Sequence, residues 1–225
     1  MQTESGNFHA PNNLIACNKE ISLATRTFLP VWFDNNATEM DSIHRYSHLE
    51  IDVNKTALIL IDVWACSNDI RLECNVKTKI VPLLKLAREQ NMPIIHVPHD
   101  RDIHEHCQPL DGELITGKEN RLSDTGCFDK YLRSHNISNL LYAGYRSNWC
   151  VLHRPTGIVK MSELGYNVIL IRDCTIAMET PETLEGEWAN KVSVNMVESQ
   201  FGSTTTLKDL LVAFGEADDL NLSLK

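Results

Sequence analysis

Cys150 is the residue of this chain best placed to do chemistry. An apolar run at 139–143 leads into Gly144, and the cysteine then opens a predicted helix. The first turn of a helix offers unpaired N–H groups and the positive end of the helix dipole. Both favour a thiolate over a thiol, so the pattern predicts a nucleophile. The alternative is a small buried hydrophobic residue, the commoner fate of a free cysteine.

Two further residues favour the nucleophile. Asp62 ends the apolar run 57–61, where a carboxylate is costly unless it is paired or used, so Asp62 could take the thiol proton. Lys118 precedes the helix that leads to the strand before Cys150, and could supply a nearby cation. The alternatives are a surface aspartate that caps the next segment and a solvated surface lysine.

The elements that must position these residues alternate between strands and helices. Strands are expected at 57–61, 93–97, 139–143 and 167–171, and helices at 76–90, 123–135, from 150, at 181–197 and at 207–214. This order predicts an α/β fold of three layers, a mostly parallel sheet with helices on both faces. Ligands bind such sheets at the carboxyl ends of the strands, where Asp62 and Gly144 both stand.

Two local signals refine this picture. Pro155 and Gly157 follow Cys150 closely, so its helix is expected to be kinked or irregular in the second turn. Ser123 is a possible cap for the helix that it opens. Residues 1–50 are irregular and are expected to form an N-terminal extension or arm, and residues 51–225 one α/β domain.

Composition excludes several classes of protein. The 30 acidic and 21 basic side chains give a net charge of −9, which argues against nucleic acid and anionic membranes as partners. No apolar run approaches the roughly 20 residues that cross a bilayer, and residues 1–10 lack a secretory signal, so a cytoplasmic location is expected. The seven cysteines include no CxxC pair, which fits free thiols rather than a disulfide framework or a zinc knuckle.

Taken in order, the strand ending in Asp62, Lys118, the segment Gly144–Cys150 and the segment Gly165–Asp173 resemble the isochorismatase-like cysteine hydrolases. That family includes nicotinamidases and N-carbamoyl amidohydrolases, and the resemblance spans roughly residues 56–211. It implies that Asp62 takes the thiol proton and Cys150 attacks a carbonyl carbon. Lys118 would hold this pair electrostatically and aid proton delivery to the leaving amine.

The resemblance also implies how the site binds its substrate. A cis peptide bond is expected between Tyr145 and Arg146, and the N–H groups of Arg146 and Cys150 would form the oxyanion hole. The family's "D-x-Q-x-x-F" pattern is absent, since Trp64 stands two residues after Asp62. The expected substrate-binding residues are Trp64, His99, Tyr145, Arg146 and Trp149.

A histidine-rich loop follows at 96–106. Asp102 and His104 match the first element of the metal site that the resemblance implies for nicotinamidases, but His106 follows at a shorter spacing. We therefore expect neither a metal nor another cofactor.

The sequence thus predicts a cysteine-dependent hydrolase of a small amide, ureido or carbamoyl compound, acting through a thioester. The partner is then a small-molecule substrate, and the resemblance and the N-terminal arm suggest a homo-oligomer. The alternatives are an isochorismatase-type vinyl ether hydrolase, and a non-catalytic binding protein on the same fold. The sequence does not identify the substrate.

Overall fold

The computed structural model describes residues 19–29, 43–65, 69–99, 101–117 and 119–216. The strands in this part of the chain form one sheet, in the order β2-β1-β8-β7-β6-β3-β4-β5. Their bounds are β1 Glu20–Leu29, β2 Ile43–Asp52, β3 Thr56–Ile61, β4 Ile94–Val97, β5 Leu114–Ile115, β6 Asn139–Tyr145, β7 Asn167–Ile176 and β8 Ser203–Thr205. The strands from β8 to β5 are parallel, whereas β1 pairs antiparallel with both β2 and β8.

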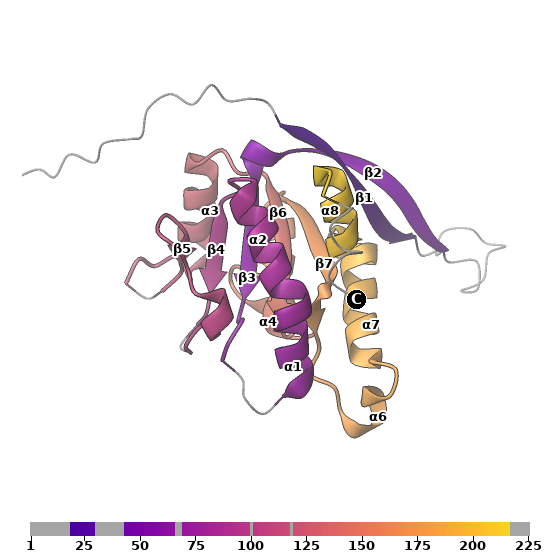
Figure 1. Cartoon of the computed structure of the whole chain (residues 1–225). Helices are drawn as coiled ribbons and strands as arrows, with labels where there is room; N and C mark the ends of the chain where they lie inside the picture. The colour runs from indigo at the N-terminus through magenta and orange to yellow at the C-terminus, as the bar shows by residue number, and fades with distance from the viewer. Residues whose placement is uncertain (1–18, 30–42, 66–68, 100, 118, 217–225) are drawn as a thin grey trace, which may run out of the picture.

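Helices cover both faces of this sheet (Figure 1). They are α1 Ile70–Asn75, α2 Val81–Glu89, α3 Thr125–Ser134, α4 Cys150–His153, α5 Ile158–Glu163, α6 Pro181–Leu184, α7 Trp188–Met196 and α8 Leu207–Phe214. A π-helical turn at Val76–Ile80 joins α1 to α2, and another at Val197–Phe201 follows α7. None of the helices in the described residues combines the length and apolar character that a bilayer crossing requires.

Two hydrophobic cores fill the spaces between the layers. One packs α1, α2 and α8 against the sheet, and the other packs α3, α4, α5 and α7 against the opposite face. Alternate residues of a strand point to opposite faces, so β3 and β6 each contribute to both cores. All six residues of β3 are buried, as expected for a central parallel strand. The predicted three-layer α/β fold is therefore confirmed.

The structure adds strands to those expected at the four apolar runs. The very short strands β5 and β8 lie in segments without a clear apolar run, and β1 and β2 form a long hairpin that joins the main sheet through β8. The described part of the predicted extension therefore continues the sheet, while residues 1–18 lie outside the described chain.

Two expectations about helix ends have different outcomes. The interruption near Pro155 is confirmed, because α4 ends at His153 and α5 begins only at Ile158. The cap of α3 is Asp124, whose carboxylate accepts from two backbone N–H groups. Ser123 instead donates to the Gly117 carbonyl oxygen at 3.3 Å, so the expectation that it caps this helix was wrong.

Gly144 fixes how closely β6 approaches β3 where the two strands end. Its φ is +110°, and a Cβ atom built there would lie 2.0 Å from the carbonyl oxygen of Ile61. No side chain fits at that distance, so only glycine brings the chain before Cys150 against the residue before Asp62.

We expect Gly144→Ala to lower the free energy of unfolding by at least about 3 kcal/mol, because the methyl group adds a steric clash to an unfavourable φ. Gly165→Ala is the matched control, since Gly165 has φ +86° but nothing within 4 Å of a built Cβ. The control should lose only about 1–2 kcal/mol. Urea unfolding of both variants measures the difference, and equal losses would contradict the role given to the close approach.

Candidate active site

Asp62 stands at the carboxyl end of β3, where the chain leaves the sheet. Its φ of +50° is left-handed, a conformation that aspartate tolerates better than most residues. The side chain is 0% exposed, and its Oδ2 accepts hydrogen bonds from Arg154 Nη2 at 2.6 Å and Nε at 3.2 Å. Oδ1 has no partner of good hydrogen-bond geometry among the described residues, so one carboxylate oxygen remains open to a proton.

The thiol of Cys150 lies beside this carboxylate and is half-buried. Burial is the largest cause that raises its pKa, and the hydrogen bond and negative charge of Asp62 raise it further. The charge of Arg154 and the backbone of Arg146 lower the pKa, but by less. The resting group is therefore a thiol, and the expectation that the helix start favours a thiolate was wrong. The physical reason is the burial of the thiol, to which the charge of Asp62 adds, beside a helix of only four residues whose dipole is weak.

Arg154 is the functional residue that sequence reasoning missed. It lies four residues after Cys150, at the end of α4, and one helical turn brings it back to the same acid as the thiol. Its guanidinium compensates a carboxylate that would otherwise be buried without a counter-ion. A basic residue one turn after the nucleophile was the available signal.

The turn from Tyr145 to Trp149 leads into Cys150 and is held by hydrogen bonds. The peptide bond between Tyr145 and Arg146 is cis, as the resemblance implied. The Ser147 N–H donates to the Ile176 carbonyl at 3.1 Å, and its hydroxyl donates to Asn190 Oδ1 at 2.7 Å. The turn is thus anchored to the end of β7 and to α7.

Asn148 adds a second anchor to the same turn. Its amide donates to the Met178 carbonyl oxygen at 3.1 Å and accepts from the Met178 N–H at 2.9 Å. Among the described residues, the backbone hydrogen bonds of turns, loops and helix caps include none donated by the N–H of Arg146 or of Cys150. The role of these two groups as an oxyanion hole stays a prediction.

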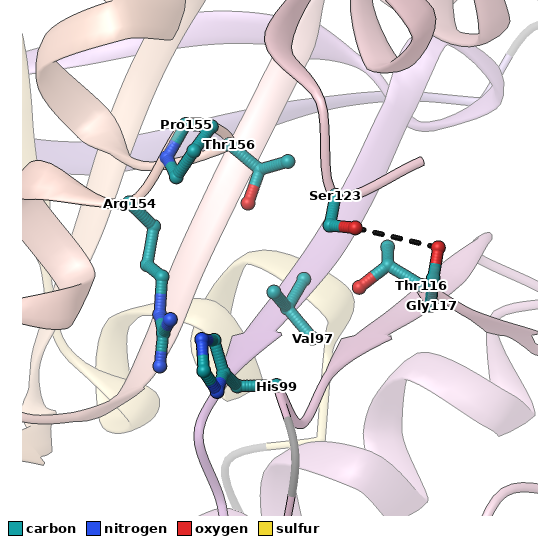
Figure 2. Close-up of a pocket in the computed structure, with 8 residues that line it drawn as sticks. All are labelled: Val97, His99, Thr116, Gly117, Ser123, Arg154, Pro155 and Thr156. Atoms are coloured by element: carbon teal, nitrogen blue, oxygen red, sulfur yellow. Dashed lines mark hydrogen bonds between the residues drawn. The ribbon is translucent and has the colours of Figure 1, made fainter. Parts of the chain in front are cut away.

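A cavity of about 160 Å³ lies next to the Asp62–Arg154 pair. The described residues that line it come from the ends of β4 and β5, from the residues just before α3, and from the break between α4 and α5: Val97, His99, Thr116, Gly117, Ser123, Arg154, Pro155 and Thr156 (Figure 2). Strand ends that are far apart in sequence therefore meet at one edge of the sheet, as expected for this fold.

The predicted substrate-binding residues fall in different places. His99 lines the cavity, and its side chain and that of Arg154 point toward each other (Figure 2). Trp149 is 61% exposed at the start of α4. Tyr145 is only 1% exposed, belongs to the core on the α1 side, and donates its hydroxyl to Asn75 at 2.9 Å. A substrate role for Tyr145 is therefore not supported, because its position in β6 turns the ring into the core.

Trp64 and Arg146 are engaged with protein partners. Trp64 donates its indole N–H to the Pro98 carbonyl at 2.9 Å, and the guanidinium of Arg101 lies 4.5 Å from the ring centre. Arg146 donates to Asp69 at 3.0 Å. Burial would raise the pKa of Asp69, but the hydrogen bond from Arg146 and the charge of Arg71 outweigh it and lower this pKa below its ordinary value. Neither residue lines the cavity in the described set.

Lys118 lies outside the described residues, although its neighbour Gly117 lines the cavity. The part assigned to Lys118 by the resemblance stays a prediction.

Two histidines of the segment 96–106 lie at hydrogen-bond distance from carboxylates. His104 Nε2 lies 3.0 Å from Glu73, and its Nδ1 accepts from the backbone N–H of His106. His96 lies 2.8 Å from Glu113 and is buried, and burial is the main cause that lowers its pKa. Among residues 19–29, 43–65, 69–99, 101–117 and 119–216, no three histidine, cysteine or acidic side chains are grouped as metal ligands would be.

Known proteins with this fold were compared with the chain. The cysteine hydrolase from Pseudomonas syringae pv. phaseolicola is 20% identical, with a TM-score of 0.60, over 74% of this chain and 95% of that one. An isochorismatase from Pseudomonas putida is 19% identical, with a TM-score of 0.55, over 68% and 89% of the two chains. The nicotinamidase from Staphylococcus aureus is 14% identical, with a TM-score of 0.51, over 65% and 96%.

These solved structures share the fold at low sequence identity. No match to the sequence was found among the curated proteins. The model of the isochorismatase domain, in contrast, matches residues 56–209. This range includes Asp62, Cys150 and the residues that line the cavity. The chain therefore belongs to the isochorismatase family.

Proposed function

We propose that the protein is a cysteine-dependent hydrolase of a small amide, ureido or carbamoyl compound, with Cys150 as nucleophile. The observation that carries this proposal is the contact between the Cys150 thiol and the buried carboxylate of Asp62. A thiol that is neutral at rest needs a base at hand, and Asp62 Oδ1 is open to a proton. Membership of the family supports a hydrolytic reaction. A thiol nucleophile favours cleavage of the carbon–nitrogen bond of a carbonyl compound over cleavage of a vinyl ether.

The reaction begins when Asp62 takes the thiol proton and the sulfur attacks the carbonyl carbon. The N–H groups of Arg146 and Cys150 stabilise the resulting oxyanion. Asp62 then returns the proton to the leaving nitrogen as the C–N bond breaks, which leaves a thioester. Water loses a proton to Asp62 as it attacks the thioester, and the proton passes to the sulfur when the acid departs.

The two cations have separate parts in this proposal. Arg154 pairs with Asp62 and compensates the charge of the buried carboxylate. Lys118 holds the Asp62–Cys150 pair electrostatically and assists proton delivery to the amine. The binding roles of Trp64, Arg146 and Trp149, the homo-oligomer and the cytoplasmic location remain predictions of the sequence.

A screen for ammonia release over amides, ureido acids and carbamoyl compounds tests the proposed reaction. We expect turnover of at least one compound and its loss in Cys150→Ala, because no other group forms the thioester. Cys127→Ala is the control, since Cys127 is a partly exposed free thiol on α3. Full activity in Cys150→Ala would instead favour a vinyl ether hydrolase, whose chemistry needs no thiol.

Asp62→Asn should move turnover and thiol reactivity in opposite directions. Hydrolysis should fall by about 10²–10⁴-fold because the base is lost. Alkylation of Cys150 by iodoacetamide at pH 7 should become about tenfold faster, because the charge that raises its pKa is gone while Arg154 remains.

Peptide mapping after brief labelling measures the alkylation rate. The control is Asp129→Asn, which removes a carboxylate paired with Arg133 on α3 and should change neither rate. Slower alkylation in Asp62→Asn would show that Asp62 does not hold the thiol in its neutral form.

Chelation should leave activity unchanged. The ring nitrogens of His96 and His104 already lie at hydrogen-bond distance from Glu113 and Glu73, so a metal would have to displace both carboxylates. Dialysis against a strong chelator, followed by the ammonia assay, measures this. Activity that disappears and returns with zinc would overturn the expectation.

A further inference from the structure

The turn that leads into Cys150 is bound by α7, a helix to which none of the described residues that line the cavity belongs. The Ser147 hydroxyl donates to Asn190 Oδ1 at 2.7 Å, and Ser147 is only 1% exposed. Asn190 lies in the first turn of α7, which begins at Trp188. The bond therefore joins the segment just before the candidate nucleophile to an element from a distant part of the chain.

Glu179 binds the same end of α7 from the loop that follows β7. Its carboxylate accepts from the backbone N–H of Ala189 at 3.0 Å and from that of Asn190 at 3.0 Å. N–H groups in the first turn of a helix have no intrahelical partner, and a negative charge there is favoured by the helix dipole. Glu179 thus fixes where α7 begins, and with it the position of the Asn190 side chain.

These bonds close a ring that includes the turn. Met178 precedes Glu179, and the Asn148 amide donates to the Met178 carbonyl oxygen at 3.1 Å and accepts from its N–H at 2.9 Å. The ring runs through Ser147, Asn190, Glu179, Met178 and Asn148. Hydrogen bonds that are joined in a network reinforce one another, so the ring holds the turn more firmly than separate bonds would.

The turn in its place determines where the thiol of Cys150 lies. The Arg146 carbonyl oxygen accepts from the N–H groups of Trp149 and Val151, at 3.0 and 3.2 Å. The residues on both sides of Cys150 are therefore bound to the turn. The thiol meets Asp62, which follows a different strand, so their contact depends on how the two strand ends are placed. A misplacement of about 1 Å between reacting groups can cost about 10²-fold in rate.

We propose that Asn190 is a positioning residue of the candidate active site. Acting through the Ser147 hydroxyl, it keeps the turn in the geometry that holds the Cys150 thiol against the Asp62 carboxylate. The alternative is that this bond only adds to the stability of the fold, as any buried hydrogen bond does. The effect of Asn190 on turnover rests on the proposed hydrolysis, but its effect on the thiol does not.

The pH dependence of Cys150 alkylation by iodoacetamide tests this role, because the thiolate is the species that reacts. Burial is the main cause that raises the pKa of Cys150, and the contact with Asp62 raises it further. Both effects weaken when the turn is released, so the profile should move to lower pH in Ser147→Ala and in Asn190→Ala. We expect alkylation at pH 7 to become about threefold faster or more in each variant, as measured by peptide mapping.

Ser193→Ala is the matched control. Ser193 is 2% exposed, and its hydroxyl donates to the Ala189 carbonyl oxygen at 2.8 Å, so this bond is equally buried but stays within α7. Its loss should lower the free energy of unfolding about as much as Ser147→Ala does, as measured with urea, and should leave the alkylation profile unchanged. The double variant of Ser147→Ala and Asn190→Ala should match the single variants, because the two side chains act through one bond.

Three results would overturn the positioning role: an unchanged profile in both single variants, an equal change in Ser193→Ala, or additive changes in the double variant. Alkylation needs no substrate, so failure of the proposed hydrolysis leaves this measurement intact. In the active enzyme, Ser147→Ala and Asn190→Ala should each lower kcat by about tenfold or more with little change in KM, because placement of the nucleophile is lost rather than substrate binding.

Discussion

The buried ion pair between Asp62 and Arg154 is the interaction on which the rest of this site depends. A carboxylate without exposure is strongly destabilised unless a cation and hydrogen bonds compensate it, and Arg154 supplies both at 2.6 Å. The pair fixes where the carboxylate lies, which oxygen remains open, and how strongly the neighbouring thiol holds its proton. It also joins the reacting groups to the cavity, because the same guanidinium lines one side of that space.

The fold places this pair by bringing strand ends together from distant parts of the chain. Asp62 follows β3 and Cys150 follows β6, two neighbouring strands of the sheet. The close approach at Gly144 sets their spacing, and the break at Pro155 turns Arg154 back toward the acid. Asp62 and Gly144 both have a positive φ, a conformation that an ordinary residue fits poorly, and such conflicts with local preference are concentrated at functional sites.

The pKa of Cys150 is set by burial, hydrogen bonds and nearby charges, which shift it in opposite directions. Burial and the charge of Asp62 favour the thiol, while Arg154 and the Arg146 backbone favour the thiolate. The effects that favour the thiol are the larger, so the pKa of Cys150 lies above its ordinary value. In the proposed reaction, the sulfur would therefore stay neutral until Asp62 takes its proton.

The sequence alone determined the layered α/β fold, the placement of Asp62 and Cys150 at strand ends, and the interruption of the helix after the cysteine. These features follow from apolar runs, from proline and from glycine, which act locally. Only the tertiary structure decided that Arg154 pairs with Asp62, that Arg146 pairs with Asp69, and that Tyr145 faces the core. The state of the thiol was likewise decided by burial and by charges from another strand, because electrostatic energies depend on distances that sequence spacing does not give.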